Sequence, residues 1–140
     1  MAVTATPVFV QTPQVALAVV STVTGLTAVT LLTGGTNGSK VVSLTAASTN
    51  GGAIVVSVAV VRSAVSYTLG TFSVPANSGT DGATAAFNIL GSTLISGLPV
   101  DNDGQLYLFL ATSADSVTLT PTTTVSAGKN INFTAIYGNF

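Results

Sequence analysis

The chain has 140 residues, a length that suits one domain. Only 5% of its residues are charged and the net charge is −1, whereas soluble domains are typically about 25% charged. The three basic residues, Lys40, Arg62 and Lys129, are scattered, so we expect no nucleic-acid partner. Because there is no cysteine, disulfides and thiolate sites are excluded.

The composition indicates an all-β protein. Val and Thr, which are abundant, are β-branched and favour strands, and the sequence contains no Glu. Ser and Thr supply most of the polarity, which predicts a neutral, hydroxyl-rich surface. Such a surface protects poorly against association, so we expect the chain to be a subunit of a larger assembly.

Residues 1–14 contain Pro7 and Pro13 and no periodic apolar face. They are predicted to form an extended N-terminal arm, with residues 15–140 as a single β-sandwich domain. The arm is either a frayed terminus or a segment that lies on a neighbouring subunit.

The apolar run Val15–Leu32 approaches the length of a membrane span. Several Ser and Thr residues and Gly25 interrupt it, and no Lys or Arg flanks its start, so no membrane segment is expected. Two strands joined near Thr24-Gly25 explain the run better. The first of them alternates, which places four side chains on one face: Val15, Leu17, Val19 and Val23.

The next strand is predicted over Lys40–Ser48, with its inward side chains at Val42, Leu44 and Ala46. The stretch Ala53–Pro75 then gives the longest strand-like signal in the sequence. We interpret it as a central β-hairpin onto which the other strands pack.

Alternation places four residues of this hairpin on one buried face: Ile54, Val56, Val58 and Val60. Arg62-Ser63 interrupts the apolar run and predicts a turn. Gly70 stands where the apolar parity changes, which is typical of a β-bulge, and Pro75 ends the strand.

Further short strands are predicted over Ala83–Leu90, Gln105–Leu110, Ser116–Thr120 and Lys129–Tyr137. About eight strands with frequent turn signals predict a jelly-roll-like β-sandwich, with an immunoglobulin-like sandwich as the alternative.

The strand Gln105–Leu110 is apolar on both of its faces. A strand of this kind must be covered on both faces, either by another layer of the fold or by a partner subunit. We therefore predict an interface formed by five residues: Leu106, Tyr107, Leu108, Phe109 and Leu110.

The residue types argue against an enzyme, because the sequence has no His, Cys or Glu. No cofactor is expected. Asp101 and Asp103, which alternate before Gly104, form the one candidate metal site, and their oxygen ligands would suit Ca²⁺. The alternative is an Asx turn that leads into the strand at Gln105. The three tyrosines, Tyr67, Tyr107 and Tyr137, lie on parities that predict core positions rather than a sugar-binding platform.

Four segments carry a resemblance to a known family: Thr30–Val41, Tyr67–Gly82, Leu98–Leu110 and Asn130–Phe140. They resemble small β-rich proteins encoded in the structural gene regions of tailed phages and prophages. The resemblance implies a virion location and a role as a capsid decoration or cement subunit, or a related head or tail accessory protein. It also implies a homo-oligomer, commonly a trimer, that binds the major capsid protein.

Two other functions remain open from the residues alone. One is a fibre, tail or cell-surface adhesin module that binds glycans. The other is a binding module stabilised by a metal at Asp101 and Asp103.

Overall fold

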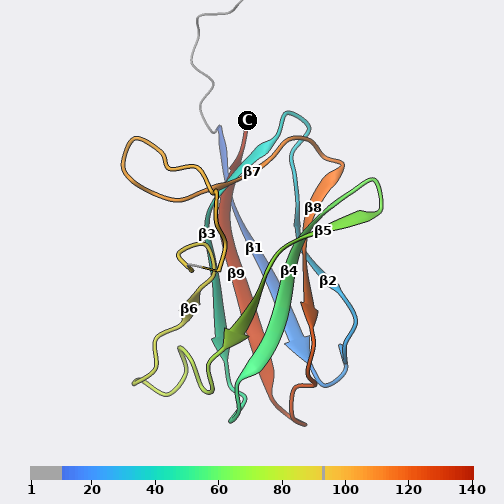
Figure 1. Cartoon of the computed structure of the whole chain (residues 1–140), viewed down its shortest axis with the longest axis vertical. Coiled ribbons are helices and arrows are strands. Elements are labelled where there is room, and N and C mark those ends of the chain that lie inside the picture. The colour runs from blue at the N-terminus through green and yellow to red at the C-terminus, as the bar shows by residue number, and fades with distance from the viewer. Residues whose placement is uncertain (1–10, 93) are drawn as a thin grey trace, which may run out of the picture.

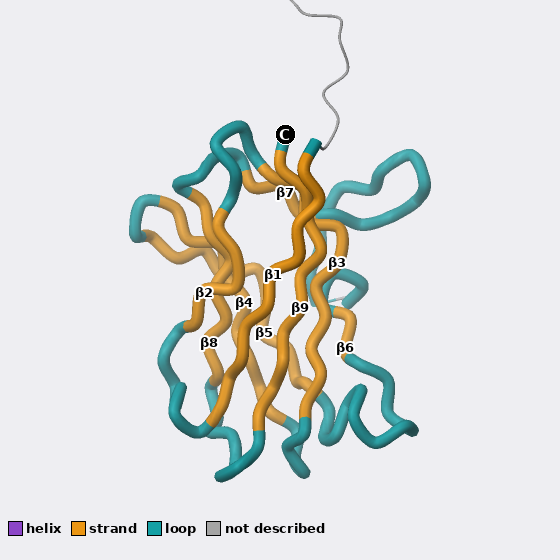
Figure 2. The backbone as a smooth tube through the Cα atoms, turned by 180° about the vertical axis from the view of Figure 1, so that it is seen from behind, coloured by secondary structure: helices purple, strands orange, loops and turns teal. Residues whose placement is uncertain are grey.

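A computed structural model describes residues 11–92 and 94–140, and these residues form two antiparallel sheets that face each other (Figures 1 and 2). The first sheet contains β1 (Thr12–Ser21), β9 (Asn130–Asn139) and β3 (Ser39–Ser48), with β6 (Phe87–Asn88) and β7 (Leu108–Leu110) both paired to β3. The second sheet has the order β2 (Val29–Thr33), β8 (Asp115–Pro121), β4 (Ile54–Arg62) and β5 (Val65–Val74). Within the described part of the chain, no helix has the length and hydrophobicity needed to cross a membrane.

The strand pairing is that of a jelly roll. β1 pairs with β9, β2 with β8, β3 with β6 and β7, and β4 with β5, all antiparallel. The chain thus forms one long antiparallel ribbon that closes at the β4–β5 hairpin. Rolling this ribbon places β9 beside β3 and β8 beside β4, which produces the two sheets. The all-β jelly-roll prediction is confirmed, and the immunoglobulin-like order, in which early strands pair with each other, is not found.

The core lies between the two sheets and is made of alternating side chains from both. As predicted, Ile54, Val56 and Val58 of β4 are buried in it, and Val60 packs at its margin. The largest fully buried side chains are Phe72, Phe133, Leu44, Ile89, Leu110, Leu119 and Ile131.

The β4–β5 hairpin contains the predicted turn and β-bulge, and β5 ends at Val74, directly before Pro75 as predicted. Its two turn residues, Ser63 and Ala64, have φ values of 51° and 65°, which correspond to a type I′ turn. Opposite the bulge, Val58 pairs with Gly70 and Ala59 with Thr68, which leaves Leu69 as the extra residue. The hairpin is not central, however, because β5 lies at the edge of its sheet.

The first strand begins at Thr12, so the last residues of the predicted arm belong to the sheet. Residues 1–10 of the arm lie outside the described residues. Val15, Leu17 and Val19 do share one face of β1, but this face is exposed, and the smaller Ala18 together with Val20 faces the core.

Two other side-chain predictions were wrong. Val42 is exposed, because a register shift between Val41 and Ser43 turns Val41 into the core in its place. Tyr67 pairs with Val60 and is nevertheless exposed, because it lies near the tip of the β4–β5 hairpin, where the residues of β5 from Val65 to Thr68 are all exposed.

Candidate interaction surface

The predicted interface segment is divided between the core and the surface. Only Leu108–Leu110 form a strand, β7, and Leu108 and Leu110 are buried in the core of this chain. These two leucines are therefore unavailable to a partner subunit, and the fold itself covers that face of the segment. Leu106 is half-buried and forms an isolated bridge with Val100.

On the opposite face, aromatic residues reach the surface. The Phe109 side chain is 51% exposed and its ring lies 5.8 Å from the ring of Phe140, centroid to centroid. The half-buried Tyr107 lies under the ammonium group of Lys40, with 4.6 Å between Nζ and the ring centroid. Tyr107 and Phe109 are thus the members of the predicted interface whose face is not covered by the second sheet.

The Asp101–Gly104 loop forms an Asx turn. Asp101 Oδ1 accepts hydrogen bonds from the backbone N–H groups of Asp103 (3.0 Å) and Gln105 (2.9 Å), and its Oδ2 accepts one from Lys40 Nζ (3.1 Å). The hydrogen bond from Gln105, together with that from Lys40, lowers the pKa of Asp101 below its usual range. Both oxygens of Asp101 are therefore engaged within the chain.

The charged neighbour of Asp101 outside this loop is the ammonium group of Lys40. No group of three or more His, Cys, Asp or Glu side chains gathers among residues 11–92 and 94–140. Ca²⁺ takes six to eight oxygen ligands, and the Lys40 ammonium group occupies the position beside Asp101 that a cation would need.

A second apolar surface lies along the first strand and was not identified as such from the sequence. Val15, Leu17 and Val19 are 63%, 73% and 50% exposed, and Ile136 of β9, the direct partner of Val15, is exposed beside them. We call these four residues the β1 stripe. The alternation of the sequence indicated this shared face, but not the side of the sheet on which it lies.

The β1 stripe lies in a neutral region of the molecule. The sequence contains no charged residue before Lys40. Elsewhere, Lys40 pairs with Asp101 and Arg62 pairs with Asp115, so four of the few charges neutralise each other in pairs. Electrostatic repulsion therefore does little to keep another neutral surface away from the stripe.

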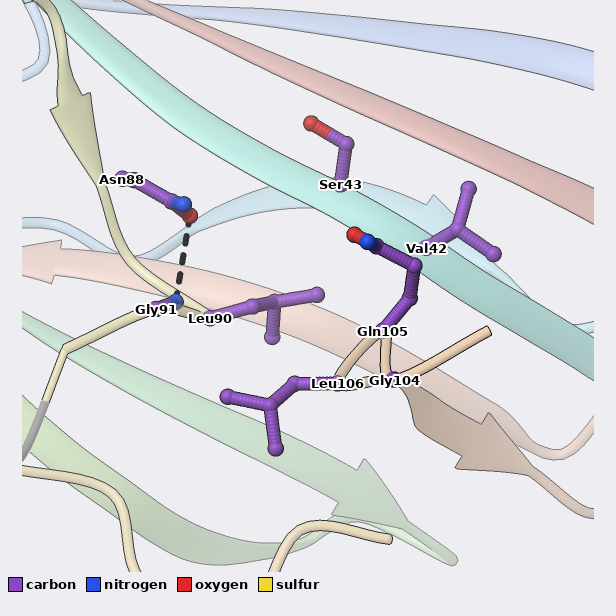
Figure 3. A pocket seen from close by; sticks show the side chains of 8 residues that line it. All are labelled: Val42, Ser43, Asn88, Leu90, Gly91, Gly104, Gln105 and Leu106. Atoms are coloured by element: carbon purple, nitrogen blue, oxygen red, sulfur yellow. Dashed lines mark hydrogen bonds between the residues drawn. The ribbon is translucent and has the colours of Figure 1, made fainter. Parts of the chain in front are cut away.

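A pocket of about 310 Å³ lies beside β3, between the segments that contain β6 and β7 (Figure 3). Ser43, Asn88 and Gln105 supply its polar groups, and Val42, Leu90 and Leu106 supply apolar walls. Asn88 Oδ1 accepts a hydrogen bond from the Gly91 N–H at 3.1 Å. These lining residues carry no titratable side chain, so they offer no general acid or base.

No protein-family model and no curated protein matches this sequence. Among solved structures, the chain aligns with a chain of the cyanophage Pam1 capsid asymmetric unit, with a TM-score of 0.51 and 18% identity. The alignment covers 99% of this chain and 94% of that chain. A chain of the extra small virus (XSV) virus-like particle of the giant freshwater prawn Macrobrachium rosenbergii aligns with a TM-score of 0.35 and 13% identity, over 99% of this chain and 87% of that chain. The alignment with the Pam1 capsid chain shows a shared fold along nearly the whole of both chains.

Proposed function

We propose that this chain is a non-enzymatic structural protein of a phage particle, and more specifically a capsid decoration or cement subunit. In this role it forms a homo-oligomer, a trimer, and binds the outer surface of the shell built by the major capsid protein. The observation that carries the proposal is the jelly-roll fold shared, nearly end to end, with a chain of a phage capsid asymmetric unit.

The surface of the chain supports this role. A neutral surface with an exposed apolar stripe is poorly suited to a free monomer, but it suits a subunit whose neighbours cover it. Burial of apolar area at such contacts stabilises an assembly by about 25 cal/mol per Å². The exposed Phe109 and the half-buried Tyr107 supply a second apolar area, which we assign to contact with the shell.

Deletion of the gene from the phage or prophage that encodes it tests the role directly. Particles should still assemble, lack this chain in mass spectra of purified virions, and release their genomes at a lower temperature than wild-type particles. Purified protein added to these particles should bind them and restore the release temperature.

Three results would contradict the proposal. If the deletion prevents shell assembly, the chain is not a decoration subunit. If wild-type virions lack the chain, or if purified protein stays monomeric and does not sediment with particles, the chain is not part of the virion. A Phe109→Ser variant tests the shell contact, since it should bind the particles more weakly than a control variant with the exposed Thr71→Ala substitution on β5.

A further inference from the structure

Among residues 11–92 and 94–140, no strand pairs with the outer edge of β1. β1 is the first strand in the order of its sheet and pairs only with β9, over all ten of its residues. The other side of β1 therefore presents backbone N–H and C=O groups that a further strand could pair with. Edge strands are commonly protected by charged side chains or proline, and β1 has no charge and a proline, Pro13, only near its start.

The exposed face of β1 places apolar side chains directly beside this edge, where an added strand would contact them. Side chains of Val15, Leu17 and Val19 project beside the open edge, and Ile136 extends the apolar area onto β9. A strand added at the edge would satisfy backbone groups, and its side chains would cover part of the stripe. Main-chain pairing of this kind gives affinity, while the alternating side chains give specificity.

Residues 1–10, with the sequence MAVTATPVFV, have the chemistry that this edge requires. They carry no charged side chain and are rich in Val, which matches a neutral, apolar surface. Ten extended residues span about 33 Å at about 3.3 Å per residue, which equals the length of the ten-residue β1. Pro7 fits an added strand, because proline is tolerated on an outermost strand where its nitrogen faces away from the ladder.

The start of β1 favours a neighbouring copy over the same copy. The Gln11 N–H donates to the carbonyl of Asn139 at 2.9 Å, and Thr12 is the register partner of the same residue. A hairpin of residues 1–10 onto their own β1 would therefore have to make its turn before Gln11. The turn would use part of the segment and shorten the added strand.

We propose that residues 1–10 of one copy of this chain add as a strand to the free edge of β1 in a neighbouring copy, where their side chains cover part of its β1 stripe. This inference rests on the proposed function, because it identifies the contact by which the copies associate.

Crosslinking between differently labelled copies tests the proposal. The chain has no cysteine, so each introduced thiol is unique. Full-length Val8→Cys and Leu17→Cys proteins are purified separately, mixed, and treated with a short bis-maleimide, which tolerates small differences in register. Mass spectrometry should identify linked peptides from the two different variants. A mixture of Val8→Cys with Thr71→Cys, a residue exposed on β5 of the other sheet, is the control and should give little product.

Leu17→Asp provides a second readout in solution. Because Leu17 is exposed, the variant should fold normally, and a carboxylate buried by the added strand should weaken self-association by about tenfold or more in sedimentation. Val65→Asp, at an exposed apolar position of β5, is the matched control and should associate like the wild type.

The outcomes separate this inference from the proposed function. If the protein associates and binds particles, but Val8→Cys links equally to Leu17→Cys and Thr71→Cys, the inference is wrong and the proposed function stands. If a Val8→Cys/Leu17→Cys double variant links only within one chain, the segment pairs with its own β1, and the inference is again overturned. If the wild type neither associates nor binds particles, the proposed function itself fails.

Discussion

Asp115 and Arg62 face each other across the β8–β4 ladder and form a two-pronged ion pair, with Nε–Oδ1 at 2.5 Å and Nη2–Oδ2 at 2.6 Å. The Asp115 side chain is 1% exposed and also accepts a hydrogen bond from the Ala111 N–H at 2.8 Å. One carboxylate thus joins the β7–β8 turn to the end of β4. The hydrogen bond from Arg62 lowers the pKa of Asp115 from 3.8 to about 2, against the opposing effect of burial.

This pKa shift predicts how stability depends on pH. Because the pKa of the folded state lies below that of the unfolded state, the carboxylate stabilises the fold fully above pH 4 or so. The contribution should be lost as the pH falls from there towards about 2. Thermal unfolding at a series of pH values should show a steeper acid decline for the wild type than for Asp115→Asn. An Asp103→Asn control should follow the wild type, and parallel curves for all three proteins would exclude this role of Asp115.

Gly70→Ala should destabilise the fold. A Cβ atom at residue 70 would lie 2.9 Å from Cζ of Phe72, whose ring is fully buried and packs against Phe87. We expect a loss of about 1–3 kcal/mol in the free energy of unfolding, measured by denaturant titration, because the ring must shift in a packed core. Gly51→Ala is the matched control, since nothing lies within 4 Å of its added Cβ. Equal stabilities of the two variants would contradict the prediction.

The β4–β5 turn can be improved. Ser63 and Ala64 both adopt positive φ values, which cost roughly 1 kcal/mol for residues other than Gly and, to a lesser extent, Asn. A Ser63→Asn/Ala64→Gly double variant should therefore be more stable by about 1 kcal/mol, because Asn-Gly is the preferred pair for a type I′ turn. Ala64→Val should have the opposite effect in the same denaturant titration. A turn of another type would leave the double variant unchanged or less stable.

Calcium and chelators should leave the melting temperature unchanged. Asp101 is engaged by Lys40 and by the Asx turn, so we expect the loop to be held by the protein alone. Asp101→Asn should lower the melting temperature only slightly, because the amide oxygen can still accept the turn's hydrogen bonds and the lost ion pair is partly exposed. A rise in melting temperature with calcium that Asp101→Asn abolishes would instead establish an ion site.

Local features of the chain were predictable where a residue type, such as glycine or proline, is typical of one local backbone structure. Gly70 at a parity change predicted the bulge, and Pro75 predicted the end of β5. The bulge at Val42 contains neither glycine nor proline. Val41 and Ser43 fit a regular strand equally well, so no residue there indicates a bulge. The sequence therefore predicted Val42 inward, where the structure places Val41.

The choice of buried face on β1 depends on a strand far away in the sequence. Alternation separates Val15, Leu17 and Val19 from the smaller residues, but it does not say which set faces the core. Pairing with β9 decides this, because Ala18 stands opposite Phe133, whose buried ring fills the space between the sheets. A larger side chain than alanine would compete with that ring for the same volume.

The same long-range dependence limited the prediction of the interface. The doubly apolar pattern of residues 106–110 was real, but the core of this chain covers Leu108 and Leu110. On the other face, Phe109 lies against Phe140 at the far end of the sequence, a contact that no local pattern encodes.

The pairing of β1 with β9 also orders events during synthesis. Of the strands that the structure describes, the ribosome synthesises β1 first and β9 last. β1 therefore cannot form its hydrogen bonds with β9 until residues 130–139 have been translated. The docking edge that we assign to β1 exists only once this ladder has formed. A prematurely terminated chain that lacks β9 therefore also lacks this edge, so only a chain translated through β9 can present it.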